Sequence, residues 1–420
     1  MPHIHLRKLF ILIVLLMLLF ASNNMPHILR KDREFFLYLW KLSEIYRSMK
    51  FIASSTQLLI GLNSVSKVIS SKPALAILDN YLFDLKGNTL SVTASNGETT
   101  LRTDITIEKV FEDGQITVPA RLFTDSLRSL PDQPLTFATD HNSSLIITWA
   151  SGASKIPFHP AEDYPAMPAI GEEFNTVAIS AEALMNGISD TIYATAEEEL
   201  RPVMNGIFFD IDTDSLSMVA SDAHKLVRYS LSGIKSAAPC SFILHKKPAA
   251  ILKSILAKVE DDVVIKFDKR NAFFAFGDTL LVCRLIDGNY PAYKSILPKN
   301  NPNKMIINRT ELLGAVRRVA VYSNQATSHV LLKISGSELM ISAEDTGFSI
   351  SAYERLSCEY DGTPLEIGFK APFLADILNN FCFENVCVQM ADNCRPALIV
   401  SADGNNASED LSALLMPVMV

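Results

Sequence analysis

The stretch STQLLIGL (residues 55–62) recurs twice in altered form, as SAEALMNGI (180–188) and NRTELLGAV (308–316). Each copy has the apolar spacing of a helix start, and Leu58, Leu184 and Leu312 hold equivalent places in the three copies. The intervals between these leucines are 126 and 128 residues. Such a period is much longer than a solenoid repeat, so the sequence predicts three whole domains of one fold.

Two further patterns recur at the same interval. Alternating strands follow the first helix, at Leu90/Val92/Ala94, Leu216/Met218/Ala220 and Leu339/Ile341/Ala343. A second helical stretch comes next, at 119–127, 245–252 and 369–378. We expect an α+β fold in which each domain packs two helices against antiparallel sheets of about eight strands. The expected domains are 49–174, 175–303 and 304–420, and the first domain's helices are expected at 56–70 and 120–130.

Residues 1–48 do not belong to the repeat. Arg7 and Lys8 precede an apolar run of 13 residues, 9–21. This run is shorter than the about 20 residues of a membrane span and has the length of a signal-peptide core. We interpret 1–48 as a non-core extension with a start codon assigned upstream, and we expect the native protein to begin at Met49. The alternative is an exported or membrane-attached β-rich repeat protein that binds protein or glycan, and intact-mass measurement separates the two.

The charge balance limits how the protein can meet nucleic acid. The chain carries a formal charge of −8, and residues 1–48 hold seven Lys/Arg against three Asp/Glu, so the remainder carries −12. An acidic total excludes a chain whose whole surface coats nucleic acid, but it permits a local basic face. The predicted helices offer such a face: Lys67, Arg121, Arg128, Lys246, Lys247, Lys253, Lys258, Arg309, Arg317, Arg318 and Lys370. A basic helical layer suits sequence-independent contact with phosphates.

Motifs that carry catalysis are missing. The chain has neither a phosphate-binding G-x-x-x-x-G-K-[ST] loop nor a G-x-G-x-x-G fingerprint. The run 221–224, SDAH, holds triad-type residues, but a triad needs members from separate elements, so we predict a tight loop. The six cysteines show no C-x-x-C pair and are interpreted as reduced thiols. We therefore expect no enzyme, no cofactor and no metal.

Several stretches carry a family resemblance. They are MKF (49–51), KPALAIL (72–78), TVPARLF (117–123), ASDAHKL (220–226), DGNYPAY (287–293), LPKN (297–300) and LMPV (415–418). In this order, and with the threefold repeat, residues 49–420 resemble the bacterial DNA polymerase III β subunits, the replication sliding clamps. The resemblance implies three sliding-clamp domains per chain and a head-to-tail homodimer that closes a ring around duplex DNA. It also implies a processivity factor without catalysis, in the cytoplasm at the nucleoid.

The resemblance assigns roles to individual positions. We expect DNA contacts, without sequence preference, from Lys72, Arg121, Arg128, Arg201, Lys246, Lys247, Lys253 and Arg317. The dimer seam is expected to pair the strand of Ile156 and Phe158 with Val321 and Tyr322 of a second copy. Apolar side chains on a strand edge favour aggregation unless they are paired, so strand addition between subunits gives them a purpose.

The implied partner cleft lies between the second and third domains. Its positions are Met204, Ser221, Ala223, His224, Lys225, Leu226, Pro291, Tyr293, Ile296, Pro396, Leu414, Met416, Pro417, Val418 and Met419. Polymerase, clamp-loader and repair proteins are expected to bind there through short peptides. Ala223 replaces the family's usual glycine, Lys225 its usual arginine, and the chain ends without a basic residue, so the peptide preference is expected to differ.

Overall fold

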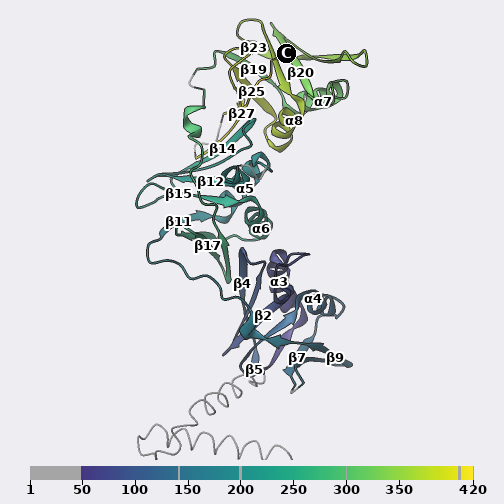
Figure 1. Ribbon diagram of the computed structural model, residues 1–420, viewed down its shortest axis with the longest axis vertical. Coiled ribbons are helices and arrows are strands. Elements are labelled where there is room, and N and C mark those ends of the chain that lie inside the picture. The colour runs from purple at the N-terminus through teal and green to yellow at the C-terminus, as the bar shows by residue number, and fades with distance from the viewer. Residues whose placement is uncertain (1–48, 141, 198–200, 299, 405–407, 420) are drawn as a thin grey trace, which may run out of the picture. The chain divides into compact units, whose positions relative to one another are not determined.

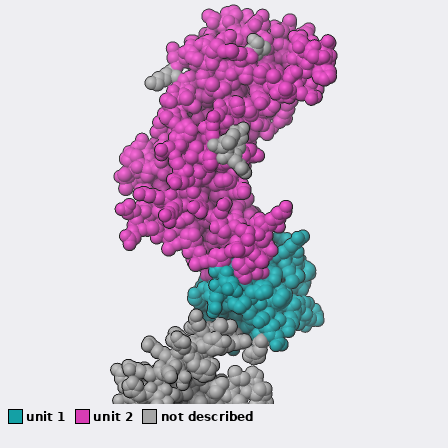
Figure 2. All heavy atoms as spheres, viewed as in Figure 1, with its two compact units in different colours: residues 1–58, 82–90, 106–164 teal, residues 59–81, 91–105, 165–420 magenta. Residues whose placement is uncertain are grey.

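The computed structural model describes residues 49–419 except 141, 198–200, 299 and 405–407. The expectations for 1–48, and for Val420, therefore lie outside the described residues. The chain forms two compact units, coloured separately in Figure 2. Unit 1 comprises residues up to Leu58 together with Leu82–Leu90 and Thr106–Tyr164, and unit 2 comprises Leu59–Tyr81, Ser91–Ile105 and Pro165–Val420.

Unit 1 contains a five-stranded sheet of order β5-β1-β7-β8-β9. The bounds are β1 Lys50–Ser54, β5 Lys109–Glu112, β7 Pro134–Thr139, β8 Ser144–Trp149 and β9 Gly152–Pro157. Also in this unit are β6 Gly114–Pro119, β10 His159–Pro160, η4 Ala161–Asp163 and helix α4 Ala120–Arg128. Phe51 stacks on Phe137 with 4.7 Å between ring centroids, and the edge of Phe123 meets Phe83 at 5.1 Å. The Phe123 ring, on α4, also lies 6.0 Å from that of Phe137 on β7, and this contact joins the sheet to α4.

Unit 2 contains a nine-stranded sheet of order β15-β12-β13-β14-β27-β26-β25-β19-β23 and a four-stranded sheet of order β22-β21-β20-β24. Their bounds are β12 Gly206–Ile211, β13 Ser215–Ser221, β14 Lys225–Ser232, β15 Cys240–His245, β19 Asn303–Asn308, β20 His329–Ser335, β21 Glu338–Asp345, β22 Ile350–Ser357, β23 Glu359–Asp361, β24 Leu365–Lys370, β25 Asn385–Met390, β26 Ala397–Ser401 and β27 Glu409–Leu415.

A third run of paired strands in unit 2 is β4-β18-β17-β16-β11. The bounds are β4 Thr99–Thr106, β11 Asn175–Ser180, β16 Asp262–Phe267, β17 Asn271–Phe276 and β18 Thr279–Arg284. Strands β2 Asn80–Lys86 and β3 Thr89–Ser95 contribute residues to both units. The pairings are antiparallel, as predicted.

Strand pairing joins segments that lie far apart in the sequence. Strand β14 runs antiparallel to β27, with Lys225 opposite Leu415 and Leu226 opposite Leu414. Strand β4 pairs in the same way with β18. The second and third expected domains therefore share one continuous sheet, which the repeat alone did not indicate. The expected domain boundaries themselves stay predictions.

The helices occur in pairs that pack on these strands. In unit 2, α5 Ala181–Thr191 lies beside α6 Lys246–Leu256, and α7 Arg309–Ala320 lies beside α8 Ala371–Asn380 (Figure 1). Short 3₁₀ turns complete the helical set: η3 Ala76–Asp79, η5 Ile192–Ala194, η6 Pro202–Asn205 and η7 Tyr293–Ser295. The α+β plan with antiparallel sheets is thus confirmed.

The repeat is visible in how the first helices begin. The side-chain oxygen of Ser180 accepts a hydrogen bond from the amide of Ala183, and Asn308 accepts from Glu311. Ser54 accepts from Gln57 at the same spacing. Each cap satisfies a backbone N–H that has no partner within its own helix. The same local device therefore starts the equivalent helix three times.

One helix is shorter than predicted. Helix α3 spans Ser55–Val65 and gives way to the 3₁₀ turn η2 Ser66–Val68, whereas the apolar spacing predicted a helix to residue 70. The serines at 64, 66 and 70 compete for backbone hydrogen bonds, and the β-branched side chains at 65, 68 and 69 disfavour helix. Helix α4 matches its prediction to within two residues at its end.

The repeated apolar positions form the core. Leu58, Leu184 and Leu312 are fully buried, and the nine alternating strand residues that mark the repeat are all buried. Burial of a leucine side chain contributes about 1.5–3 kcal/mol. The sequence pattern therefore identified core residues in all three copies.

None of the helices in the described part of the chain combines the length and apolarity that crossing a bilayer requires.

Candidate functional site

A tight turn connects β13 to β14 at the centre of the nine-stranded sheet. Asp222 Oδ1 accepts hydrogen bonds from the amides of His224 (2.9 Å) and Lys225 (2.8 Å). Ser221 Oγ accepts from the amide of Ala223 and donates to the carbonyl of Lys225. These bonds confirm the prediction that SDAH is a tight loop. Ala223 has φ of +73°, in the left-handed region that favours glycine.

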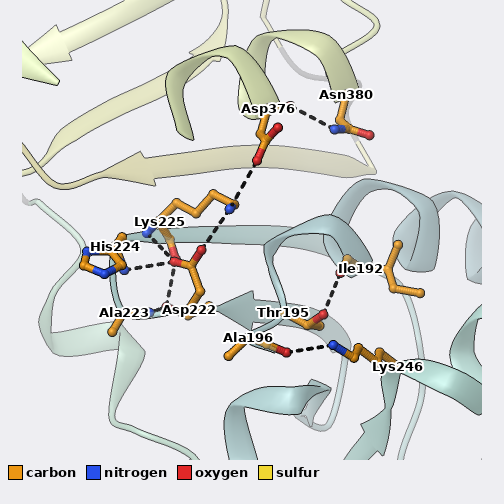
Figure 3. A network of polar contacts seen from close by, with 11 residues as sticks. Ile192, Thr195, Ala196, Asp222, Ala223, His224, Lys225, Lys246, Asp376 and Asn380 are labelled. Carbon is orange, nitrogen blue, oxygen red and sulfur yellow. Dashed lines mark hydrogen bonds and ion pairs between the residues drawn. The ribbon is translucent and has the colours of Figure 1, made fainter. Parts of the chain in front are cut away.

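Lys225 ties this turn to helix α8. Its side chain is only 5% exposed, and its Nζ lies 2.8 Å from Asp222 Oδ2 and 3.5 Å from Asp376 Oδ2 (Figure 3). The ammonium also lies 4.7 Å from the ring centroid of Phe373. A buried cation is tolerated only when it is paired, and this one has two carboxylates and an aromatic face.

Phe373, in the first turn of α8, gathers two more polar side chains. The His224 ring stacks on it with 5.1 Å between centroids and 20° between planes. The ammonium of Lys370, the last residue of β24, lies 5.0 Å from the same centroid. One aromatic ring therefore positions groups from β14, from the turn before it and from β24.

The C-terminal tail crosses the same region after β27. The amide of Met416 donates to the carbonyl oxygen of His224 at 3.0 Å, and the amide of Val418 donates to that of Gly368 at 2.9 Å. The second bond makes Val418 a one-residue bridge beside β24. The tail is thus held at one end by the turn and at the other by the edge of the four-stranded sheet.

These elements enclose a cavity of about 300 Å³. Its lining residues are His224, Ala326, Thr327, His329, Lys370, Phe373, Met416, Pro417 and Val418. Met416 is 41% exposed, so an apolar, flexible side chain forms part of the rim. A concave site with apolar walls and a few polar groups is the usual form of a ligand or peptide site.

A packed apolar cluster lies on the β14 side of the site. Val219, Leu226, Tyr293 and Leu414 are each at most 4% exposed, and Phe208, Tyr290 and Leu297 pack against them. Tyr293 donates its hydroxyl to Asp210 Oδ2 at 2.7 Å. Burial, and then this carboxylate acceptor, raise the pKa of Tyr293 above its ordinary value. The cluster fixes the loop before Leu297 onto β12.

The structure brings together most of the expected cleft positions, in different roles. His224, Met416, Pro417 and Val418 line the cavity, whereas Leu226, Tyr293 and Leu414 belong to the buried cluster. Ser221, Ala223 and Lys225 build the turn. Pro396 precedes β26 next to the start of the tail, and Pro291 and the 49%-exposed Ile296 lie on the Tyr293 loop. Met204, in η6, and Met419, 89% exposed, are not among the lining residues.

Sequence reasoning missed five lining residues: Ala326, Thr327, His329, Lys370 and Phe373. The stretch 369–378 was identified as a repeated helix, and Lys370 as part of a basic helical face. Nothing local connects these residues to a tail more than 40 positions later. His329 and Lys370 become neighbours because β20 pairs with β24.

The residues expected to contact DNA lie at the surface, except that Lys246 is partly buried. Lys72, Arg121, Arg128, Arg201, Lys247, Lys253 and Arg317 are exposed. Lys246 instead donates to the carbonyl of Ala196 and to Glu197 Oε1, both at 3.1 Å, and its side chain is 25% exposed. Its ammonium therefore fastens the segment after η5 to α6. Arg317 donates to Asn379 Oδ1 at 2.9 Å and Arg128 lies 3.6 Å from Asp125.

The expected dimer residues differ in exposure. Val321 and Tyr322, after α7, are 75% and 43% exposed. Ile156 is 2% exposed because strand alternation turns its side chain into unit 1, and Phe158 is half-buried. Only the backbone of Ile156 is thus free to take part in a seam at β9.

Within the described ranges, no group of three or more His, Cys, Asp or Glu side chains is placed to hold a metal ion.

Family models match the chain in three successive parts. The N-terminal, central and C-terminal domains of the DNA polymerase III beta subunit match residues 49–168, 178–292 and 294–419. A curated beta sliding clamp from Vibrio cholerae is 29% identical over 359 residues, covering 86% of this chain and 98% of that protein. The beta sliding clamp of Escherichia coli K12 is 29% identical over 371 residues, covering 88% and 100%.

Solved structures agree with these sequence matches. A Pseudomonas aeruginosa sliding clamp, crystallised with griselimycin, superposes with a TM-score of 0.83 at 28% identity and covers 89% of this chain and 100% of that one. A Bartonella birtlesii clamp gives a TM-score of 0.80 at 27% identity with the same coverage. The exported binding protein considered as an alternative receives no support from these comparisons. The chain belongs to the family of bacterial DNA polymerase III beta subunits, the sliding clamps.

Proposed function

We propose that two copies of this chain close a ring around duplex DNA and that the cavity beside Met416 holds peptide segments of DNA-processing partners. As a member of its family the chain is a sliding clamp, a non-catalytic accessory subunit of a DNA polymerase. The observation that carries the proposal is the match of all three family domains, in order, onto the threefold repeat. A clamp works on the chromosome, so the proposal places the chain in the cytoplasm, at the nucleoid.

Contact with DNA is proposed to be electrostatic and independent of sequence. Exposed basic residues lie on or near the helices, among them Lys247 and Lys253 of α6 and Arg317 of α7. Lysine and arginine contacts with phosphates release counterions and therefore weaken with salt. A closed ring would hold circular DNA even where those contacts are weak, because the DNA has no end through which to leave.

Two sheet edges that have no partner strand among the described residues support ring closure by a second copy. Strand β9 ends the sheet of unit 1, and β22 ends the four-stranded sheet of unit 2. Phe348, just before β22, is 76% exposed, and Ile350 and Tyr353, on β22, are 40% and 68% exposed. Exposed edges with apolar side chains invite pairing with another strand. We propose that β22 of one copy adds to β9 of the other, with Val321 and Tyr322 covering the seam.

Partner binding is proposed to use the cavity and the exposed apolar residues beside it. Burial of two apolar anchors would contribute about 1.5–3 kcal/mol each before ordering costs, which suits micromolar affinity. Partners that exchange on one clamp, such as replicative polymerase, clamp loader and repair proteins, need complexes of that strength. Their segments would insert against Met416 and Ile296.

The test compares how well the protein is retained on circular and on linear DNA. The protein is loaded onto a nicked circle with a clamp loader and then washed at high salt, before and after the circle is cut once. Retention on the circle with release after cutting is the expected result. Equal loss from both forms, or binding confined to one duplex sequence, would overturn the proposal.

A further inference from the structure

The described residues that line the cavity include one lysine and two histidines and no carboxylate. Lys370, His224 and His329 are the ionisable residues among the nine that line it. His329 and Lys370 are directly opposite in the β20–β24 pairing, so their side chains leave the same face of the sheet. A polar end lined by one ammonium and two imidazoles therefore adjoins apolar walls formed by Met416, Pro417 and Val418.

Two carboxylates near this site, those of Asp222 and Asp376, are not among the lining residues and pair with another cation. Asp222 Oδ2 and Asp376 Oδ2 both point to the buried ammonium of Lys225 (Figure 3). The other carboxylate oxygen of Asp222 accepts the two backbone hydrogen bonds of the turn. Lys225 thus offsets the negative charge of these two carboxylates. The main cation of the cavity that has no such partner is Lys370.

Lys370 is held in position without an ion pair. Within the described part of the chain no carboxylate lies within ion-pair distance of its ammonium, which instead lies 5.0 Å from the Phe373 centroid. The side chain is half-buried. A fixed, partly desolvated cation attracts an anion more strongly than a fully solvated one. The ring and the stacked His224 limit where that anion can sit.

We propose that Lys370 is a specificity-determining residue of this cavity, which selects peptide segments that carry a carboxylate next to their apolar anchors. The inference rests on the proposed function, because it describes what that same site prefers. The Met416, Pro417 and Val418 walls favour a peptide over a bare phosphate, since they offer apolar surface and no further donor. The preferred ligand is an acidic, amphipathic peptide.

The experiment compares two synthetic ten-residue peptides with the same leucine and phenylalanine anchors. One carries Asp between the anchors and the other carries Asn. Affinity is measured by fluorescence anisotropy against the full chain at low and high salt. We expect the Asp peptide to bind about three- to tenfold more tightly at low salt, in the range of a charge-assisted contact, with a smaller difference at high salt.

Three variants locate the effect. Lys370→Gln should remove the preference while the Asn peptide binds as before, and Lys370→Glu should reverse it. Lys333→Gln, which removes a surface lysine paired with Glu366 on the neighbouring strand, is the matched control and should keep the preference. Thermal unfolding and light scattering of each variant check that fold and assembly are unchanged.

The outcomes distinguish a failure of the proposed role of Lys370 from a failure of the proposed peptide cleft. Equal binding of both peptides to the unchanged protein, or a preference that survives Lys370→Gln, overturns the role of Lys370 and leaves the cleft standing. Binding of neither peptide overturns both. Displacement of the bound peptides by a short DNA duplex would assign the cavity to nucleic acid instead.

Discussion

The ammonium of Lys225, at the start of β14, lies 3.5 Å from the carboxylate of Asp376 on α8, across 151 positions of sequence. A second carboxylate, Asp222, approaches the same ammonium at 2.8 Å. Breaking a buried pair leaves an uncompensated charge, whereas an exposed pair contributes little. Since the Asp222 side chain is 16% exposed and that of Asp376 is 55% exposed, the two carboxylates should differ in their contribution.

Asp222→Asn should destabilise the protein by about 1–3 kcal/mol, because it removes the closer charge from Lys225 while an amide oxygen can still accept the turn's backbone bonds. Asp376→Asn should cost less than about 1 kcal/mol. Urea denaturation of both variants gives the comparison. Equal effects of the two substitutions would contradict the unequal sharing of Lys225.

Ala223→Gly should leave stability unchanged or raise it by up to about 1 kcal/mol. The left-handed conformation costs a residue with a Cβ about 1–2 kcal/mol, and glycine removes this cost. The greater freedom of glycine in the unfolded chain opposes this stabilisation by about 0.5–1 kcal/mol. Ala250→Gly, at an exposed position within α6, should instead cost about 1 kcal/mol. A similar loss in both variants would show that the turn at Ala223 is unstrained.

Asp190, on α5, should make stability depend on pH. Burial raises its pKa from 3.8 to about 6, Lys253 partly opposes the shift, and Glu409 adds to it. Because the folded pKa lies above the unfolded value, the native state binds more protons between these pH values. Stability should therefore fall as pH rises through this window.

Asp190→Asn removes that dependence. The variant should be more stable than the unchanged protein above pH 6, by at most about 3 kcal/mol, and the difference should vanish below pH 4. Denaturation at a series of pH values measures it. Glu172→Gln, which removes an exposed carboxylate, is the control, and a gain of the same size there would point to net charge instead of burial.

Tyr353→Asp should weaken the dimer. The side chain is 68% exposed on β22, at the edge of its sheet, and an unpaired charge enclosed in the proposed apolar seam would be costly. We expect at least about a tenfold weaker dimer, measured by light scattering across a dilution series. Leu75→Asp, also at an exposed apolar side chain but away from sheet edges, should stay dimeric. Ile156→Asp is a poor probe, because a charge at that buried position would unfold unit 1 itself.

Lys247→Gln and Lys246→Gln should differ in their effect on DNA. Lys247 is exposed, whereas the ammonium of Lys246 is engaged by Ala196 and Glu197. Removing one phosphate contact should lower the salt slope of binding to linear duplex by about 0.9. We expect this change for Lys247→Gln and a smaller one for Lys246→Gln, in titrations over a range of salt concentrations. A larger change at Lys246 would mean that its ammonium leaves Glu197 when DNA binds.

The sequence by itself determined the threefold repeat, the alternating strands and most of the core. Leu58, Leu184 and Leu312 could be read as buried because helical spacing depends on residues within a few turns of one another. The caps at Ser180 and Asn308 are local in the same sense, since each bonds an amide three residues ahead. The resemblance that led to the sliding-clamp family also rests on short, ordered stretches.

Only the tertiary structure decided which distant residues meet. The pairing of β14 with β27 sets Lys225 opposite Leu415, and the pairing of β20 with β24 sets His329 beside Lys370. Neither pairing has a local signal, because both strands of each pair have the same alternation as many others. Exposure was decided there too: Ile156 turns inward and Lys246 is held by Glu197, although the resemblance implied a seam at the first and a DNA contact at the second. Strand register and the geometry of ion pairs depend on where whole segments pack, and residue spacing alone does not contain that information.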